Sequence, residues 1–174
     1  MPQERGRGED LDPAELAHAA EAMGYGAVKY ADLHSNRTSN YTFSFDRMLD
    51  LKGNTAVYLL YAHARIASIV RKAGRDMEGL PDNARITLDH PMELQLAKSL
   101  SAFPEAVEDA LDELAPNRLC DYLYDVSGKF NEFYGECKVI GSEEEESRLM
   151  LCEATAMIMR QCFQILGITP LMRI

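Results

Sequence analysis

PNRLCDYLYDVSGKFNEFYGEC, residues 116–137, repeats its apolar side chains at alternating intervals of four and three residues. The repeat consists of Leu119, Leu123, Val126, Phe130, Phe133 and Cys137. An α-helix turns once every 3.6 residues, so this spacing places all of these side chains along one face. The segment is therefore predicted to be a helix that packs one side against a core.

A second helix with the same signature is predicted near the C-terminus. Its apolar positions, at intervals of three and four, are Leu149, Cys152, Ala156, Met159, Phe163 and Leu166. Further apolar residues widen this face, which is typical of a helix buried on most sides. The run Ser142-Glu143-Glu144-Glu145 before it is predicted to form a capping box at the start of the helix, and not a metal site.

The rest of the chain also favours helices. Asp12 as N-cap, Pro13 at N1 and Glu15 at N3 predict a helix that Gly24 ends. Further helices are predicted over residues 27–33, 55–73, 91–101 and 104–114. The alternating stretch YTFSF is short and isolated, so an extended segment is expected there and not a sheet. The prediction is an all-α helical bundle over residues 12–174, after a disordered or cut linker at residues 1–11.

Composition limits the class of protein and its surroundings. The chain has 174 residues, of which 47% are hydrophobic and 26% charged, as in a soluble globular domain. It has no apolar run near the roughly 20 residues that a membrane span needs, and no signal peptide at its start. The four cysteines include no CxxC pair, which favours free thiols in a reducing compartment. The sequence therefore predicts a cytoplasmic protein that does not enter a membrane.

The net charge of −10 argues at first against nucleic acid, but this charge is unevenly distributed. Between Tyr25 and Arg75 there are eight lysines and arginines against three aspartates, a local charge of +5, which leaves −15 for the remainder. A local basic segment can attract an anionic partner even when the whole chain is acidic. On charge alone, solvated surface cations explain the segment equally well.

The sequence contains no motif for catalysis or for metal binding. Its four histidines show no HExxH pattern, and none is paired with cysteines at zinc-ligand spacing. KGNT lacks the first glycine and the GK[ST] order of a phosphate-binding loop, and neither GxGxxG nor GxSxG occurs. We therefore expect no catalytic residue, no metal site and no cofactor in this chain.

The predicted helix 55–73 has a polar face beside its aliphatic one. At about 100° per residue, one sector of about 80° holds Tyr58, Tyr61, Arg65, Ser68 and Lys72. Aromatic rings stack on unpaired bases and arginine binds phosphate, which is how proteins hold single-stranded RNA. This stripe is therefore a candidate RNA contact, although tyrosines that bridge a core and solvent give the same pattern.

The aliphatic face of the same helix includes one histidine. His63 falls among Leu59, Ala67 and Val70, opposite the stripe. We expect it to be a core histidine with one hydrogen-bond partner, and not a catalytic base.

Three long strings of the chain resemble one protein family. The strings GYGAVKYADLHSNRTSNYTFSFDRML, KGNTAVYLLYAHARIASIVRK and RLMLCEATAMIMRQCFQILGITPLMRI are similar to the C-terminal part of arginyl-tRNA synthetase of the cytoplasmic eukaryotic type. The resemblance extends over nearly the whole chain from about Leu11. It implies the all-α, DALR-type anticodon-binding domain of class I synthetases, in agreement with the bundle predicted from spacing.

The resemblance also implies a larger enzyme. In this family a class I nucleotide-binding fold, with HIGH-type and KMSKS-type signatures, lies upstream, and this sequence contains neither signature. The full-length enzyme would use ATP with Mg²⁺ to join arginine to tRNA through an arginyl-adenylate, whereas this chain alone is expected to be inactive. The implied partners are arginine tRNA and the catalytic domain of the same polypeptide, and not DNA.

Contacts with the anticodon carry over from the family to named residues. The YLxY string implies that Tyr58 and Tyr61 meet the anticodon loop, and the AHAR string implies that Arg65 belongs to the same surface. Ser68 and Lys72 join this surface through their place in the stripe.

Two further elements resemble parts of the family that approach the tRNA. The loop around Asn36 and Arg37 resembles one that approaches the tRNA from the side. The tail ITPLMRI resembles one that folds back near the anticodon, which implies a contact from the terminal carboxylate of Ile174. Many relatives end in methionine, so this expectation concerns the carboxylate and not the side chain.

Two other functions stay open at this point. The chain could be the anticodon domain of a different class I synthetase. It could also be a helical scaffold that binds protein through the stripe, because tyrosine and arginine are also enriched at protein interfaces. Binding to arginine tRNA, compared with a charge-matched RNA, separates these alternatives.

Overall fold

The computed structural model describes residues 11–74 and 85–174. Over these residues the chain forms seven helices and no strand, which confirms the prediction of an all-α bundle. The helices are α1 (Pro13–Leu33), α2 (Phe45–Met48), α3 (Ala56–Ala73), α4 (Pro91–Ser101), α5 (Phe103–Asp112), α6 (Pro116–Glu136) and α7 (Glu145–Ile165). The predicted disordered or cut linker, residues 1–11, lies outside the described residues except for Leu11, and so does Arg75 of the basic segment.

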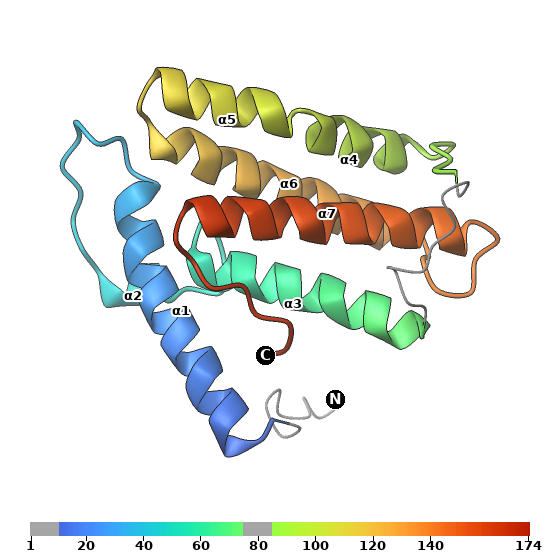
Figure 1. Ribbon diagram of the computed structural model, residues 1–174, viewed down its shortest axis with the longest axis horizontal. Helices are drawn as coiled ribbons and strands as arrows, with labels where there is room; N and C mark the ends of the chain where they lie inside the picture. The colour runs from blue at the N-terminus through green and yellow to red at the C-terminus, as the bar shows by residue number, and fades with distance from the viewer. Residues whose placement is uncertain (1–10, 75–84) are drawn as a thin grey trace.

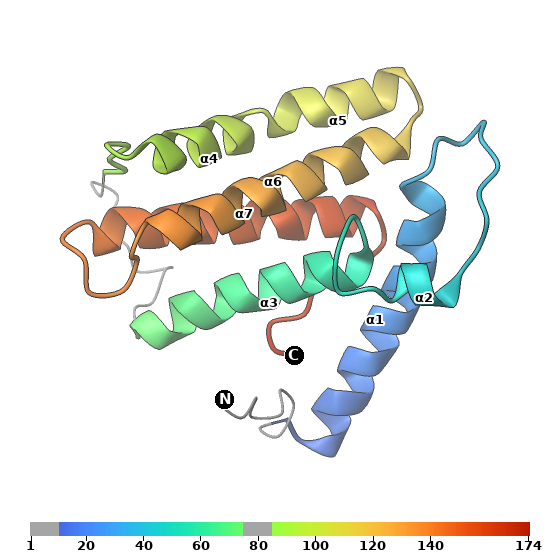
Figure 2. The ribbon, with the colours of Figure 1, turned by 180° about the vertical axis from the view of Figure 1, so that it is seen from behind.

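The long helices α6 and α7 form the centre of the bundle. α4 and α5 follow one another along α6, while α7 packs against α3, α4 and α6 (Figure 1). α1 crosses one end of this layer and packs against α3. Seen from behind, α6 lies in front of α7, with α3 alongside (Figure 2). The helix with the tyrosine stripe therefore lies at one side of the bundle, within reach of α1, α6 and α7.

The two apolar stripes predicted from spacing form the core. All six positions of the stripe on residues 116–137 are buried, and so are all six of the stripe on residues 149–166. Phe130, Phe133 and Phe163 have no exposed surface, and they belong to one cluster that also includes Leu59 and Leu60 of α3. Burial of this apolar surface is the main stabilising term for such a bundle.

The predicted break of the first helix at Gly24 is wrong. α1 runs without interruption from Pro13 to Leu33 and so passes through both Gly24 and Gly26. A glycine inside a helix costs about 1 kcal/mol relative to alanine, but packing of the helix against its neighbours outweighs this local cost. Gly26 has a packing role of its own, because a Cβ there would lie 3.3 Å from Cγ2 of Ile168 in the C-terminal tail.

The predicted capping box at the start of α7 is also wrong. The N-cap residue is Glu144, and its side chain makes no capping hydrogen bond. Ser142 instead donates its hydroxyl to the carbonyl of Val139, and the carboxylate of Glu145 accepts from the backbone N–H of Gly141. Gly141 has a φ of +74°, so the chain turns here and these side chains stabilise the loop before the helix.

Residues 41–44 of the stretch YTFSF form neither helix nor strand, and Ser44 is extended, but Phe45 begins a helix that the sequence did not predict. Phe45 opens the single turn α2, and Ser44 caps it by accepting a hydrogen bond from Arg47 N at 3.4 Å. Only Met48 of this turn is buried, between α1 and α3.

Candidate nucleic-acid interface

The start of α3 fixes the direction in which its stripe faces. Thr55 is the N-cap, and its Oγ1 accepts from the backbone N–H of Tyr58 at 3.1 Å. The same hydroxyl donates to the carbonyl of Asp50 at 2.7 Å, which ties the helix to the preceding loop. Leu59 and Leu60 are fully buried, and Gly74 ends the helix with a φ of +64°. Because the aliphatic face is locked into the core, the polar stripe must face outward.

All five residues of the predicted stripe lie on this outer face of α3. The side chains of Tyr58, Tyr61 and Ser68 are half-buried, and those of Arg65 and Lys72 are exposed. Half-buried tyrosines expose part of each ring while the remainder packs against the protein. This placement suits a stacking surface, but it also fits tyrosines that only bridge core and solvent.

Two side chains of α6 hold Tyr58 in place. Asn131 Nδ2 donates a hydrogen bond to the Tyr58 hydroxyl at 2.8 Å. The ring of Tyr124 meets that of Tyr58 edge-on, with 5.7 Å between centroids and 62° between planes. Burial raises the pKa of Tyr58, so its phenol is neutral at physiological pH. Tyr58 is therefore a rigid, uncharged ring at the junction of two helices.

Arg65 is held by another tyrosine of α6. Its guanidinium carbon lies 4.8 Å from the centre of the Tyr134 ring, a cation–π distance. Stacking of this kind leaves the guanidinium N–H groups at the rim of the plane available to an anion. Arg65 is thus placed to bind a phosphate close to two aromatic rings.

These contacts show that the surface belongs to two helices and not to one. We call it the tyrosine seam, formed by Tyr58, Tyr61 and Arg65 of α3 and by Tyr124, Asn131 and Tyr134 of α6. The three residues of α6 were not predicted from the sequence. Their spacing of seven and then three places them on one face of that helix, next to its apolar stripe, so the pattern was present. The pairing of α6 with α3 could not be read from it.

The two ends of the seam differ in charge. Near Tyr58, a shallow hollow is lined by Asp121, Asp125, Lys129 and Glu132. Lys129 pairs with Glu132 at 3.2 Å, so the aspartates leave this end acidic. The cationic side chains of the stripe, Arg65 and Lys72, come later along α3. Phosphates are therefore expected toward the later turns of α3, and base edges near Tyr58.

Asn36 and Arg37 are not part of the seam. Both are exposed in the loop between α1 and α2, which protrudes from the edge of the molecule in both views (Figures 1 and 2). The Asn36 carboxamide oxygen accepts from the backbone N–H and the hydroxyl of Thr38, at 2.9 and 2.7 Å, and so shapes the loop. A tRNA contact at this loop would be separate from one at the seam.

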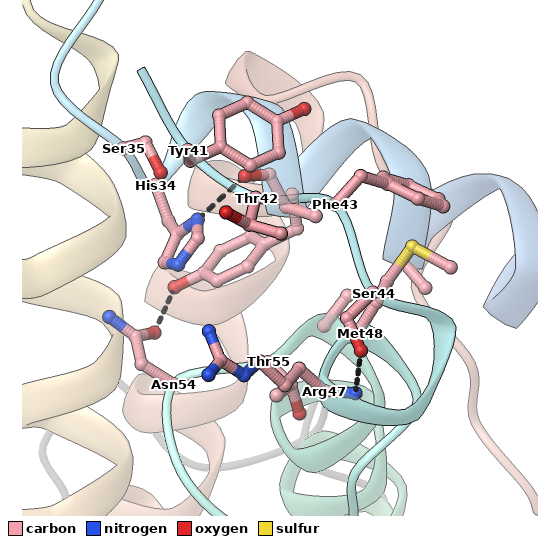
Figure 3. Close-up of a pocket in the computed structure, with 14 residues that line it drawn as sticks. His34, Ser35, Tyr41, Thr42, Phe43, Ser44, Arg47, Met48, Asn54 and Thr55 are labelled. Atoms are coloured by element: carbon pink, nitrogen blue, oxygen red, sulfur yellow. Dashed lines mark hydrogen bonds between the residues drawn. The ribbon is translucent and has the colours of Figure 1, made fainter. Parts of the chain in front are cut away.

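A pocket of about 190 Å³ lies between α1, the loop 35–44 and the start of α3 (Figure 3). Tyr30 of α1 and His34, the C-cap of that helix, stack with 5.9 Å between ring centroids. Tyr41, whose hydroxyl donates to Asp32 at 3.1 Å, and Arg47 also line the pocket. The Tyr30 hydroxyl lies 2.5 Å from Asn54 Oδ1, while Asn54 Nδ2 lies 3.5 Å from Asp121 Oδ1. Burial raises the pKa of Tyr30, so this phenol stays protonated.

The C-terminal tail folds back beside α3, as both views show (Figures 1 and 2). Ile174 is half-buried against the core, and Arg173 lies 3.6 Å from Glu15 of α1. His63 is fully buried, and its Nδ1 lies 2.7 Å from the carbonyl oxygen of Leu171 in this tail. The prediction of a core histidine with one partner is confirmed, and that partner is the tail.

The free cysteines of the described residues are buried. Burial raises the pKa of Cys120, Cys152 and Cys162 to about 12, so these free thiols remain protonated at neutral pH. Within residues 11–74 and 85–174, no group of three histidine, cysteine or acidic side chains is arranged to hold a metal ion. Over the same residues, no helix has the length and apolar content to cross a membrane.

Two family models match the chain. Residues 59–174 match the DALR anticodon binding domain. Residues 3–45 match the catalytic domain of class I tRNA synthetases of the arginine type. The first match covers most of α3 and every later helix, and the second ends within α2.

Curated relatives and solved structures agree with these matches. The chain is 58% identical to a chloroplastic/mitochondrial arginine–tRNA ligase and 57% identical to a cytoplasmic one, both from Arabidopsis thaliana, over 98% of its own length. Its fold is similar to those of the arginyl-tRNA synthetases of Plasmodium falciparum (TM-score 0.86, 34% identity, 96% of this chain) and Thermus thermophilus (TM-score 0.83, 30% identity, 95% of this chain). The chain spans only 27% and 29% of the two curated relatives, and 29% and 28% of the two solved chains.

Proposed function

We propose that this chain, which belongs to the family of DALR anticodon binding domains, is the part of an arginine–tRNA ligase that holds the anticodon loop of arginine tRNA. The observation that carries the proposal is the tyrosine seam. Tyr58 is oriented by Asn131 and Tyr124, and Arg65 by Tyr134, so this ring and this cation are already supported without a ligand. A surface that is ordered in advance loses less conformational entropy when it binds.

The seam, together with Ser68 and Lys72 of the stripe on α3, supplies three interactions that suit single-stranded RNA. The rings of Tyr58 and Tyr61 offer stacking surfaces for unpaired anticodon bases. Arg65 and Lys72 offer cations for the phosphates that follow, and Ser68 offers a hydroxyl between them. The exposed loop with Asn36 and Arg37, and the carboxylate of Ile174, are proposed as contacts outside the seam.

The whole enzyme would carry out the chemistry elsewhere. We propose that a class I catalytic domain of the same polypeptide uses ATP with Mg²⁺ to activate arginine. This chain would bind the anticodon loop of the tRNA that accepts the arginine. The match of residues 3–45 to such a catalytic domain supports this continuity. The chain alone is expected to show no arginine-dependent ATP–pyrophosphate exchange. Exchange above background with the purified chain would contradict this division of roles.

An exposed apolar surface next to α2 suits the catalytic domain as its partner. Phe45, Leu49 and Leu51 are 64%, 48% and 65% exposed, which is unusual for side chains of this type in one short segment. The match to the catalytic domain ends at residue 45, inside this segment. We therefore propose that this surface is covered in the full-length protein. Met48 of the same segment is buried and does not contribute.

The relatives do not decide in which cell compartment the protein works. The two Arabidopsis relatives, from different compartments, are 58% and 57% identical to this chain, so similarity does not choose between them. Four buried free thiols suit a reducing compartment, and we propose the cytoplasm.

A binding experiment tests the proposal against its alternatives. The chain is titrated into a fluorescently labelled anticodon stem–loop of an arginine tRNA, and into the same stem with the anticodon bases replaced. Tighter binding to the arginine anticodon is expected. Equal affinity for both RNAs would mean non-specific attraction to phosphate, and no binding to either would favour a protein scaffold.

A further inference from the structure

The tail after α7 is anchored to α1 at its beginning. Gly167, with a φ of +67°, ends the helix, and Lys29 Nζ donates to its carbonyl at 2.6 Å. The next residue, Ile168, is buried against α1 where Gly26 has no side chain. These contacts set where the tail leaves α7, but they do not fix its last residues.

The end of the tail has weaker attachments. Arg173 and Glu15 are both about 44% exposed and lie 3.6 Å apart, and an exposed pair of this kind contributes little. Ile174 is half-buried. Between Ile168 and Ile174 the tail makes one further buried contact, at Leu171.

His63 supplies that contact from inside the core. Its ring is fully buried on α3 and packs edge-on against Phe163 of α7, with 6.0 Å between centroids. Its Nδ1 donates to the carbonyl of Leu171 at 2.7 Å, and Leu171 itself is 4% exposed. The hydrogen bond is shielded from water and joins α3 to a point three residues before the end of the chain.

The second ring nitrogen of His63, Nε2, makes a histidine energetically unfavourable at this position. Nε2 of His63 is buried and has no hydrogen-bond partner among the described residues. An unpaired buried acceptor is unfavourable, whereas an apolar ring of similar size would fill the space without this cost. The benefit that remains to the histidine is the N–H that it gives to the tail.

We infer that His63 is a positioning residue, which locks the C-terminal tail at Leu171 and so sets where the carboxylate of Ile174 lies beside α3. The inference rests on the proposed function, because it makes the tail a dependable part of the tRNA-binding surface. Tyr61 and Arg65 lie two residues on either side of His63, so one helix carries the seam and holds the tail.

The test uses this chain with three substitutions. His63→Phe removes the N–H and keeps a ring, while His63→Asn keeps an N–H donor near the position of Nδ1. Thr155→Val is the matched control, because Thr155 is also fully buried on α7 but donates only within its own helix, to Leu151 O at 2.7 Å. Tail release is measured as the rate at which a carboxypeptidase removes the last residues, followed by mass spectrometry.

We expect His63→Phe to speed removal of the tail at least tenfold, His63→Asn to restore much of the slow rate, and Thr155→Val to leave it unchanged. Unchanged digestion of His63→Phe would overturn the inference whether or not the chain binds RNA. Faster digestion in all three variants, in proportion to their lost stability, would also overturn it, because the effect would then be general loosening.

A second arm connects the tail to RNA binding. Affinity for the arginine anticodon stem–loop is measured for the full chain and for a chain that ends at Met172, each with and without His63→Phe. If His63 acts through the tail, the substitution weakens binding several-fold in the full chain and has no further effect in the shortened one. Equal losses in both backgrounds would assign His63 a purely structural role. If the stem–loop binds no form of the chain, the proposed function fails, while the digestion arm still decides the positioning of the tail.

Discussion

Tyr58 is the residue at which stacking and packing can be separated most sharply. Its ring packs partly against the core, and its hydroxyl accepts from Asn131 at 2.8 Å. Tyr58→Ala would therefore lower both stability and affinity and decide little. Tyr58→Phe and Tyr58→Leu form a better pair, because the first keeps the ring without the hydroxyl and the second keeps apolar bulk without the ring.

The structure sets the size of each effect. A typical hydrogen bond contributes about 1 kcal/mol, so Tyr58→Phe should lower the free energy of unfolding by about that amount. Its ring still stacks, so affinity for the stem–loop should change by less than about twofold, equivalent to about 0.4 kcal/mol. Tyr58→Leu loses the stack, which is worth about 1–3 kcal/mol per base, or about 5- to 150-fold in affinity.

Both quantities are measured on the same preparations. Urea denaturation gives the free energy of unfolding, and fluorescence anisotropy of a labelled anticodon stem–loop gives affinity at constant salt. Leu59→Ala, on the buried face of α3, is the control: it should cost about 2–5 kcal/mol of stability and leave the affinity of the folded fraction unchanged. If Tyr58→Leu binds as tightly as the unmodified chain, Tyr58 is a structural residue and the seam is not a stacking surface.

Three further predictions concern charge, pH and packing. Arg65→Ala should weaken RNA binding and reduce the slope of log affinity against log salt by up to about one unit, as a salt titration would show; an unchanged slope would mean that Arg65 meets no phosphate. Burial lowers the pKa of His63 in the folded chain, so as pH falls below about 6.5 the unfolded chain binds a proton at this histidine before the folded chain does. The free energy of unfolding is therefore expected to fall as pH is lowered below about 6.5. His63→Phe should reduce this fall in a plot of denaturation midpoint against pH. Gly24→Ala should raise the free energy of unfolding by up to about 1 kcal/mol, because a Cβ there meets nothing within 4 Å. Gly26→Ala should not raise it, because its Cβ would press on the tail at 3.3 Å, and an equal gain at both sites would contradict the close approach.

Spacing predicted α6 and α7 because the apolar face of a helix is a local pattern. The positions of α6 and α7 that recur at three and four residues are the ones that the core buries. The error at Gly24 has a tertiary cause: the local preference for a break was real, but packing of α1 against α3 outweighed it. The capping box failed for a similar reason, since the turn at Gly141 places Ser142 two residues before the actual cap.

The arrangement of the candidate site could be predicted only within a single helix. Tyr58, Tyr61 and Arg65 share one helix, so a helical wheel finds them together. Tyr124 and Tyr134 meet them only because α3 and α6 pack side by side, and neither helix encodes that pairing in its own spacing. The hydrogen-bond partner of His63 could not be predicted from local sequence patterns either, because Leu171 is 108 residues away along the chain.

The charge pattern of the seam restricts how an RNA strand can lie on it. Next to Tyr58, the carboxylates of Asp121 and Asp125 would repel phosphates, but they can accept hydrogen bonds from the amino groups of base edges. Arg65, held over Tyr134 at 4.8 Å, and Lys72 lie two and four turns later on α3 and attract phosphates. A strand that stacks on Tyr58 must therefore direct its bases toward the acidic end and its backbone toward the later turns of the helix. If RNA binds here as proposed, the carboxylates beside Tyr58 and the cations on the later turns of α3 together orient the strand.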